Sequence, residues 1–144
     1  PYLKQKLGGE LAIGFEIVTI QNVFGKVFNA GTEFARDGSQ FDRLFDDGDR
    51  FEIGGLTGRV MHTPGHTPGS MSFWFPAAKL LIAGDTLFRG GIGRTDLWGG
   101  DFDAIEQSIR ERLYTLDADT AVVTGHGAET EIGLERETNS FVRA

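Results

Sequence analysis

The strongest constraint on the fold is the stretch His62–Ser70, HTPGHTPGS, which carries two Pro-Gly pairs. Residues 56–61 before it and 70–75 after it alternate apolar with small or polar residues, a period of two that is typical of strands. Proline and glycine allow the chain to turn sharply between such strands. We therefore expect two strands joined by a tight loop that presents His66 at a rigid strand end.

Two further strands are predicted to end in the same manner. The apolar run 79–83 stops just before Asp85, and the β-branched run 120–124 stops just before His126. Three strand ends would then carry His66, Asp85 and His126. Two imidazoles and a carboxylate are ligands that suit zinc, iron or manganese. The pattern predicts a metal site, with these three residues as its ligands.

The order TPGHTPGS, AGDTLF, GIGRTD and VTGHG resembles the metallo-β-lactamase superfamily, nearest to the glyoxalase II-type thioesterases and the related persulfide dioxygenases. The resemblance covers essentially the whole chain. It implies that His66 binds a first metal ion, that Asp85 bridges two metal ions at the catalytic centre, and that His126 binds the second. It also implies an α/β fold of the αββα sandwich type.

One family motif is absent from this sequence. Members of the superfamily carry an HxHxDH motif ahead of these ligands, whereas the only histidines here are His62, His66 and His126. His62 is assigned a structural role, because its place in the family motif is not that of a ligand. We expect residues 1–144 to be one incomplete domain, the C-terminal portion of a sandwich. The N-terminal half would accompany it, or the chain would associate with a copy of itself.

The resemblance implies a hydrolase that cleaves a glutathione thioester such as S-D-lactoylglutathione, with two zinc ions in the complete site. A first alternative is a persulfide dioxygenase with a single iron held partly by His66 and Asp85, because the N-terminal part resembles that branch. A second alternative is a fragment or assembly module without catalytic activity, since a ligand motif is lacking.

The glycine-rich loop 89–101 has little periodicity, and long loops in small domains are usually functional. Within it, Arg94 is either an anion contact for the substrate or the partner of Asp96 or Asp101 in an ion pair. Phe88, just before the loop, and Trp98 either line a pocket or pack against the protein.

Composition excludes several classes of function. The net charge of −7 argues against a nucleic-acid partner, which needs clustered lysine and arginine. The chain has no cysteine, so disulfides and thiolate metal sites are excluded. No apolar run approaches membrane-spanning length, and we expect a cytoplasmic protein that acts on a small molecule.

The remaining elements follow from periodicity. We expect a helix ending at Leu7, a strand at 11–13, a helix over 16–28, a surface loop over 29–39, a helical turn at 41–45 and a hairpin of 50–53 with 56–61. Two more helices are predicted, one from Asp103 and one over 130–142.

Each of these two helices has a predicted buried side. The first would begin with a capping box of Asp103 and Glu106 and bury Ile105, Ile109 and Leu113. The second would turn Ile132, Leu134 and Phe141 inward and Glu135, Arg136 and Glu137 outward. On the strand at 70–75, Met71, Phe73 and Phe75 are expected to form an exposed apolar surface where the other half of the sandwich would pack.

Overall fold

A computed structural model describes residues 2–29 and 35–143. Its centre is a six-stranded sheet of order β10-β9-β6-β5-β4-β3, in which β6 and β9 are parallel and the other neighbours antiparallel. The strands are β3 (Arg50–Ile53), β4 (Leu56–His62), β5 (Met71–Phe75), β6 (Leu80–Gly84), β9 (Ala121–Thr124) and β10 (Thr130–Glu131).

The other elements surround this sheet. Strands β1 (Ala12–Gly14) and β2 (Arg43–Phe45) pair in parallel, and β7 (Leu87–Phe88) and β8 (Gly91–Ile92) form a small hairpin. The helices are α1 (Tyr2–Leu7), α2 (Ile17–Val27), α3 (Phe102–Ser108) with a π-helical continuation at Ile109–Leu113, and α4 (Ile132–Thr138), and a 3₁₀ turn spans Pro76–Ala78. No helix of the described residues is both long and apolar enough to cross a bilayer.

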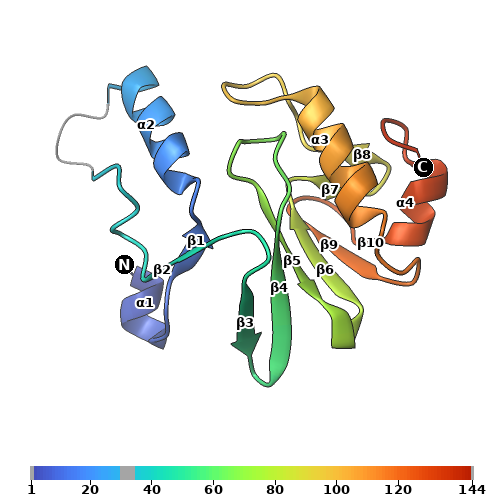
Figure 1. The fold of residues 1–144 in the computed structure, drawn as a ribbon, viewed down its shortest axis with the longest axis horizontal. Helices are drawn as coiled ribbons and strands as arrows, with labels where there is room; N and C mark the ends of the chain where they lie inside the picture. Colours follow the sequence, from blue (N-terminus) through green and yellow to red (C-terminus); the bar gives the residue numbers. More distant parts are fainter. Residues whose placement is uncertain (1, 30–34, 144) are drawn as a thin grey trace.

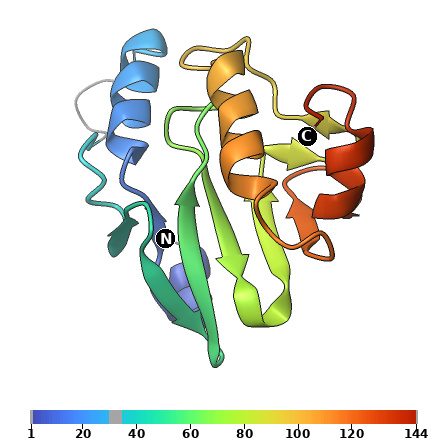
Figure 2. The same ribbon diagram turned by 45° about the vertical axis from the view of Figure 1, so that its right-hand side comes forward.

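One face of the sheet is covered by α3 and α4, which lie together on one side of it in Figures 1 and 2. The main hydrophobic core lies between these two helices and the sheet. Leu81 of β6 and its register partner Val122 of β9 are fully buried there, together with Ile105, Ile109 and Ile132 from the helices. Leu113 is fully buried as well, so the predicted stripe of Ile105, Ile109 and Leu113 is confirmed.

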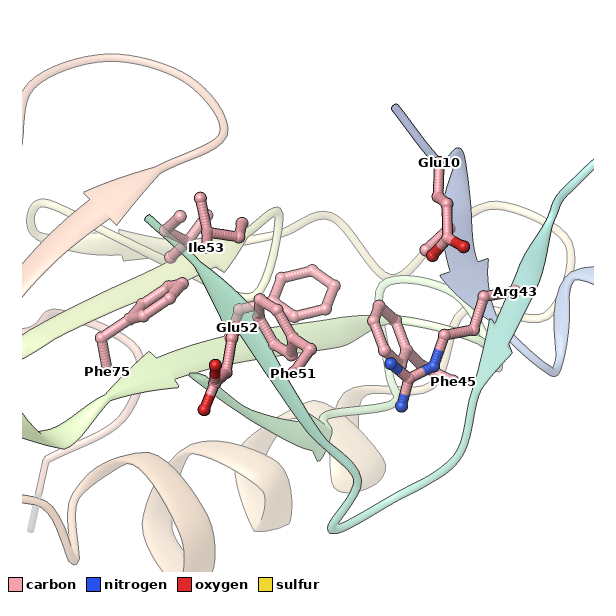
Figure 3. A pocket seen from close by; sticks show the side chains of 10 residues that line it. Glu10, Arg43, Phe45, Phe51, Glu52, Ile53 and Phe75 are labelled. Carbon is pink, nitrogen blue, oxygen red and sulfur yellow. The ribbon is translucent and has the colours of Figure 1, made fainter. Parts of the chain in front are cut away.

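The opposite face of the sheet is more open. It carries a groove of about 470 Å³ that is bounded on its far side by the N-terminal elements (Figure 3). Phe73 and Phe75 line this groove, as does Ile82, which is 38% exposed. The expected exposed surface is therefore only partly present: Phe75 is buried against Phe51, with ring centroids 5.6 Å apart. A covering layer from another part of a sandwich stays a prediction.

The predicted strands and the hairpin of β3 and β4 are confirmed within one or two residues. The helical turn expected at 41–45 is wrong, because residues 43–45 form β2 and pair with β1, which lies far earlier in the sequence. Within the expected irregular loop 89–101, Gly91 and Ile92 form β8. Residues 30–34 of the predicted loop 29–39 lie outside the described part of the chain.

The two C-terminal helices also depart from expectation. The side chain of Asp101, not Asp103, caps α3 by accepting a hydrogen bond from the backbone N of Ala104. Helix α4 ends at Thr138, well before 142. Its predicted faces are partly wrong: Leu134 and Phe141 are exposed, whereas Glu135 is only 1% exposed. Side-chain hydrogen bonds at Glu135, invisible to apolar periodicity, explain this reversal.

Candidate metal centre

His66 lies in the loop between β4 and β5, and this loop is braced by the start of α3. The backbone N of Asp101 donates to the carbonyl of Gly65 at 2.8 Å. Gly65 has φ +133°, and a Cβ there would lie 2.3 Å from the backbone N of Ile105, so the position requires glycine. Ser108 of α3 donates from its hydroxyl to the carbonyl of Pro64 at 2.8 Å. The position of His66 therefore follows from the packing of α3.

Asp85 and His126 follow two neighbouring parallel strands. Asp85 comes directly after β6, and His126 comes two residues after β9. The carboxyl ends of parallel neighbours meet at one edge of a sheet, which brings the two side chains together. The backbone N of Gly125 donates to the carbonyl of Gly84 at 2.8 Å and ties the two loops to each other.

The three predicted side chains converge on one cavity of about 290 Å³. His126 directs Nδ1 to Asp85 Oδ1 at 2.8 Å, while His66 Nε2 lies 3.6 Å from the other carboxylate oxygen, Oδ2. His66 Nδ1 donates to the carbonyl of Arg94 at 2.8 Å. Phe88, Ile92 and Gly93 complete the cavity wall.

The hydrogen bond from His66 Nδ1 to the carbonyl of Arg94 fixes which ring nitrogen of His66 is free to bind a metal ion. With Nδ1 donating its proton to a carbonyl, the neutral imidazole presents the lone pair of Nε2 toward Asp85. Nε2 and the carboxylate both offer lone pairs, which is the donor chemistry that a metal ion takes. The donor set thus fits part of a metal site. Among the described residues, however, no three His, Asp or Glu side chains are placed to surround one ion as they stand.

Two glycines, Gly93 and Gly125, lie so close to Asp85 that no side chain fits at either position. A Cβ at Gly93 would lie 1.8 Å from the carbonyl oxygen of Asp85, and one at Gly125 would lie 2.1 Å from Asp85 Oδ1. Apolar periodicity predicts a role for neither residue. Their only signal is that each stands beside a predicted site residue, in GIGR and in TGHG.

Arg94, Asp101 and His62 make contacts within the protein. Arg94 forms the predicted ion pair with Asp96, through Nε and Nη2 at 2.8 Å each, whereas Asp101 caps α3. The pairing raises the pKa of Arg94 and lowers that of Asp96 to about 2, chiefly through their hydrogen bond. A substrate contact of Arg94 stays a prediction. His62 has a structural contact, as expected, donating Nε2–H to the carbonyl of Pro68 at 2.7 Å.

The two aromatic residues have different positions. Phe88 lines the cavity and meets the His126 ring edge to face, with centroids 6.0 Å apart. Trp98 packs edge to face on Phe28 at 6.1 Å, and it also lines a small cavity of about 20 Å³ beside α2, separate from the cavity that His66 lines. Both alternatives therefore hold for this residue.

Comparison with known proteins places this geometry in a family. The model described as "Metallo-beta-lactamase superfamily" matches residues 21–126. The chain belongs to the metallo-β-lactamase superfamily. A solved member, the B3 metallo-β-lactamase BLEG-1, superposes with a TM-score of 0.82 at 30% identity, over 99% of this chain and 69% of that one.

Curated relatives of this superfamily member are longer than the chain. A probable metallo-hydrolase of Burkholderia pseudomallei is 50% identical over 123 residues, which is 78% of this chain and 42% of the relative. The hydroxyacylglutathione hydrolase GloC of Haemophilus influenzae is 40% identical over 104 residues, 72% of this chain and 49% of the relative. The chain thus spans about half the length of the curated relatives it matches.

Proposed function

We propose that this chain carries part of the metal centre of a metallo-hydrolase, with His66, Asp85 and His126 as metal ligands and Asp85 shared between two ions. One observation carries the proposal: the two oxygens of a single carboxylate face two different imidazoles in one cavity. Such a carboxylate has an oxygen for each of two neighbouring cations. The kinship with a protein named as a probable metallo-hydrolase supports the reaction class.

The residues of the chain have distinct roles in this proposal. A divalent metal ion, when bound, makes hydroxide available at neutral pH and polarises a carbonyl group. The Arg94 carbonyl fixes the tautomer and ring orientation of His66, so that Nε2 faces the metal position. Phe88 and Ile92 form an apolar wall that excludes water on one side of the reacting group.

A glutathione thioester is the proposed substrate, supported by the relative named hydroxyacylglutathione hydrolase. Arg94 stands at the rim of the cavity with a side chain 59% exposed. We assign it to a carboxylate of the glutathione moiety, which would replace or join Asp96 as its partner. Zinc is the proposed metal and iron the alternative.

The test is hydrolysis of S-D-lactoylglutathione after addition of zinc or iron, with the bound metal counted by elemental analysis. His66→Ala abolishes turnover and reduces the bound metal, whereas His62→Ala, in the same loop but with its ring on Pro68, retains both. Turnover indifferent to His66→Ala would refute the proposal.

Two other outcomes favour the alternatives. One iron per chain with oxygen uptake on glutathione persulfide points to a dioxygenase. Neither metal binding nor turnover by the 144-residue chain points to an assembly module, whose partner is a second protein segment or a second copy. Sedimentation velocity distinguishes these last two, because only self-association depends on the concentration of the chain alone.

A further inference from the structure

Glu135 is the most deeply buried carboxylate among the described residues, and both of its oxygens accept hydrogen bonds. Its side chain lies in α4 and the residue is 1% exposed. Oε1 accepts a hydrogen bond from the Thr130 hydroxyl at 2.6 Å. Oε2 accepts two more, from the backbone N of Gly90 at 2.9 Å and from Nδ2 of Asn139 at 2.8 Å. A carboxylate is costly to bury, and hydrogen bonds to a charged acceptor are the strong kind that offset this cost.

One of these bonds, together with a further bond from Asn139, connects α4 to a single turn. Gly90, which Oε2 holds, lies at the tip of the β7–β8 hairpin. The second Nδ2 proton of Asn139, itself fully buried, donates to the carbonyl of Gly91 at 3.1 Å. Glu135 and Asn139, one helical turn apart, thus grip both an N–H and a C=O of the same turn.

The β7–β8 hairpin is short. Its ladder consists of two residue pairs only, Leu87 with Ile92 and Phe88 with Gly91. A two-stranded ribbon of this length has little stability of its own. Leu87 is buried in the main hydrophobic core, and Ile92 packs against that core. The turn between the two strands, at Gly90 and Gly91, is held by the buried carboxylate and amide of α4.

The same hairpin forms one wall of the candidate metal centre. Phe88, on its first strand, lies edge to face on His126. Ile92 lines the cavity, and the chain continues directly to Arg94, whose carbonyl accepts the Nδ1 proton of His66. Both imidazoles of the site are therefore in contact with the hairpin or its continuation.

We propose that Glu135 and Asn139 are positioning residues, which hold the β7–β8 hairpin so that Phe88 and Arg94 orient the two imidazoles of the metal centre. The proposal rests on the proposed function only in taking these imidazoles as ligands. Its test needs neither metal nor substrate, so the two proposals fail independently.

Trypsin provides the first readout, because Arg89 is exposed at the hairpin tip and its bond to Gly90 is cleaved only when the turn opens. Glu135→Ala raises the rate of cleavage at Arg89–Gly90 by about tenfold relative to cleavage after Lys26 in α2. Glu135→Gln restores protection to within about twofold, since an amide oxygen still accepts from Gly90 and Asn139.

A second readout follows the imidazoles directly. The chain has three histidines, so their ring signals in a ¹H–¹⁵N correlation spectrum are assignable. In Glu135→Ala the signals of His126 shift as Phe88 moves away from its face, those of His62 stay in place, and Glu135→Gln returns the spectrum to that of the parent chain.

Thr130→Val is the matched control, because it removes a buried hydrogen bond from the other oxygen of Glu135 and leaves the hairpin contacts untouched. Equal loss of protection in Thr130→Val and Glu135→Ala would overturn the proposal, as would unchanged cleavage and unmoved His126 signals in Glu135→Ala. If Glu135→Ala does not fold, Glu135→Asp retains the charge but withdraws it by one methylene group, and the same two readouts apply.

Discussion

On the helix-covered face of the sheet, Leu81, Val122 and Ile109 have no exposed surface at all. At the edge where β6 and β9 end, the side chains of His66 and Asp85 are 22% and 30% exposed. The covered face buries carbon against carbon and stabilises the fold. At this edge His66 Nε2 and Asp85 Oδ2 lie 3.6 Å apart, and both atoms carry lone pairs that a metal ion can accept. Residues on the covered face of the sheet therefore determine stability, whereas residues at its edge are available for binding. The variants below test this division.

The largest expected effect on stability comes from the covered face. Leu81→Ala lowers the free energy of unfolding by about 3 kcal/mol, because it leaves a cavity in the close-packed core. Ile82→Ala, the next residue along β6 and 38% exposed on the open face, costs under about 1 kcal/mol. Urea unfolding at two protein concentrations measures both. Equal costs would show that another layer or copy covers the open face.

At the edge of the sheet we expect a substitution to affect metal binding strongly and stability only slightly. Asp85→Asn weakens zinc binding by roughly a hundredfold, because the amide carries no charge and only one acceptor atom, while the free energy of unfolding changes by less than about 1 kcal/mol. Calorimetric titration with zinc chloride measures the loss. Asp96→Asn is the control, since Asp96 is an exposed carboxylate that pairs with Arg94 nearby. Identical zinc affinity in Asp85→Asn and the parent chain would contradict the assignment.

Some features of the fold could be predicted from the sequence alone, and others could not. The central strands, the loop around His66 and the burial of Ile109 were predictable, because each depends on local periodicity or on Pro and Gly punctuation. Strand β2 was not predictable, since it exists only through its pairing with β1.

The outward position predicted for Glu135 is wrong for a different reason. Helical periodicity counts apolar residues and treats every carboxylate as solvated, whereas three hydrogen-bond donors from outside its own turn decide the burial of this one. The same limit hid Gly93 and Gly125, whose roles depend on how closely Asp85 approaches them in space.

The interior also has a pH-dependent group. Burial, with a further contribution from the charge of Glu135, raises the pKa of Tyr114 to about 12. Its hydroxyl lies 2.7 Å from the carbonyl of Val142. The neutral form is favoured in the folded chain, so its contribution is complete below about pH 10 and is lost toward pH 12, by about 2 kcal/mol. Tyr114→Phe removes this dependence in urea unfolding followed from pH 9 to 12. A parallel slope in both proteins would assign the effect to other groups.

The smallest effect tests the junction of the two regions, where α3 of the covered face begins beside the His66 loop. Asp101→Ala removes the cap on Ala104 and costs about 1 kcal/mol. Asp103→Ala, the cap expected from the sequence, costs under about 0.5 kcal/mol, because its side chain does not cap α3 in the structure. Zinc affinity stays unchanged in both variants, since Asp101 braces Gly65 through its backbone N–H and keeps that bond as alanine. A loss of stability in Asp103→Ala alone would support the predicted capping box of Asp103 and Glu106 instead. A zinc affinity that falls in Asp101→Ala would show that the metal centre depends on the helix cap as well as on the backbone hydrogen bond.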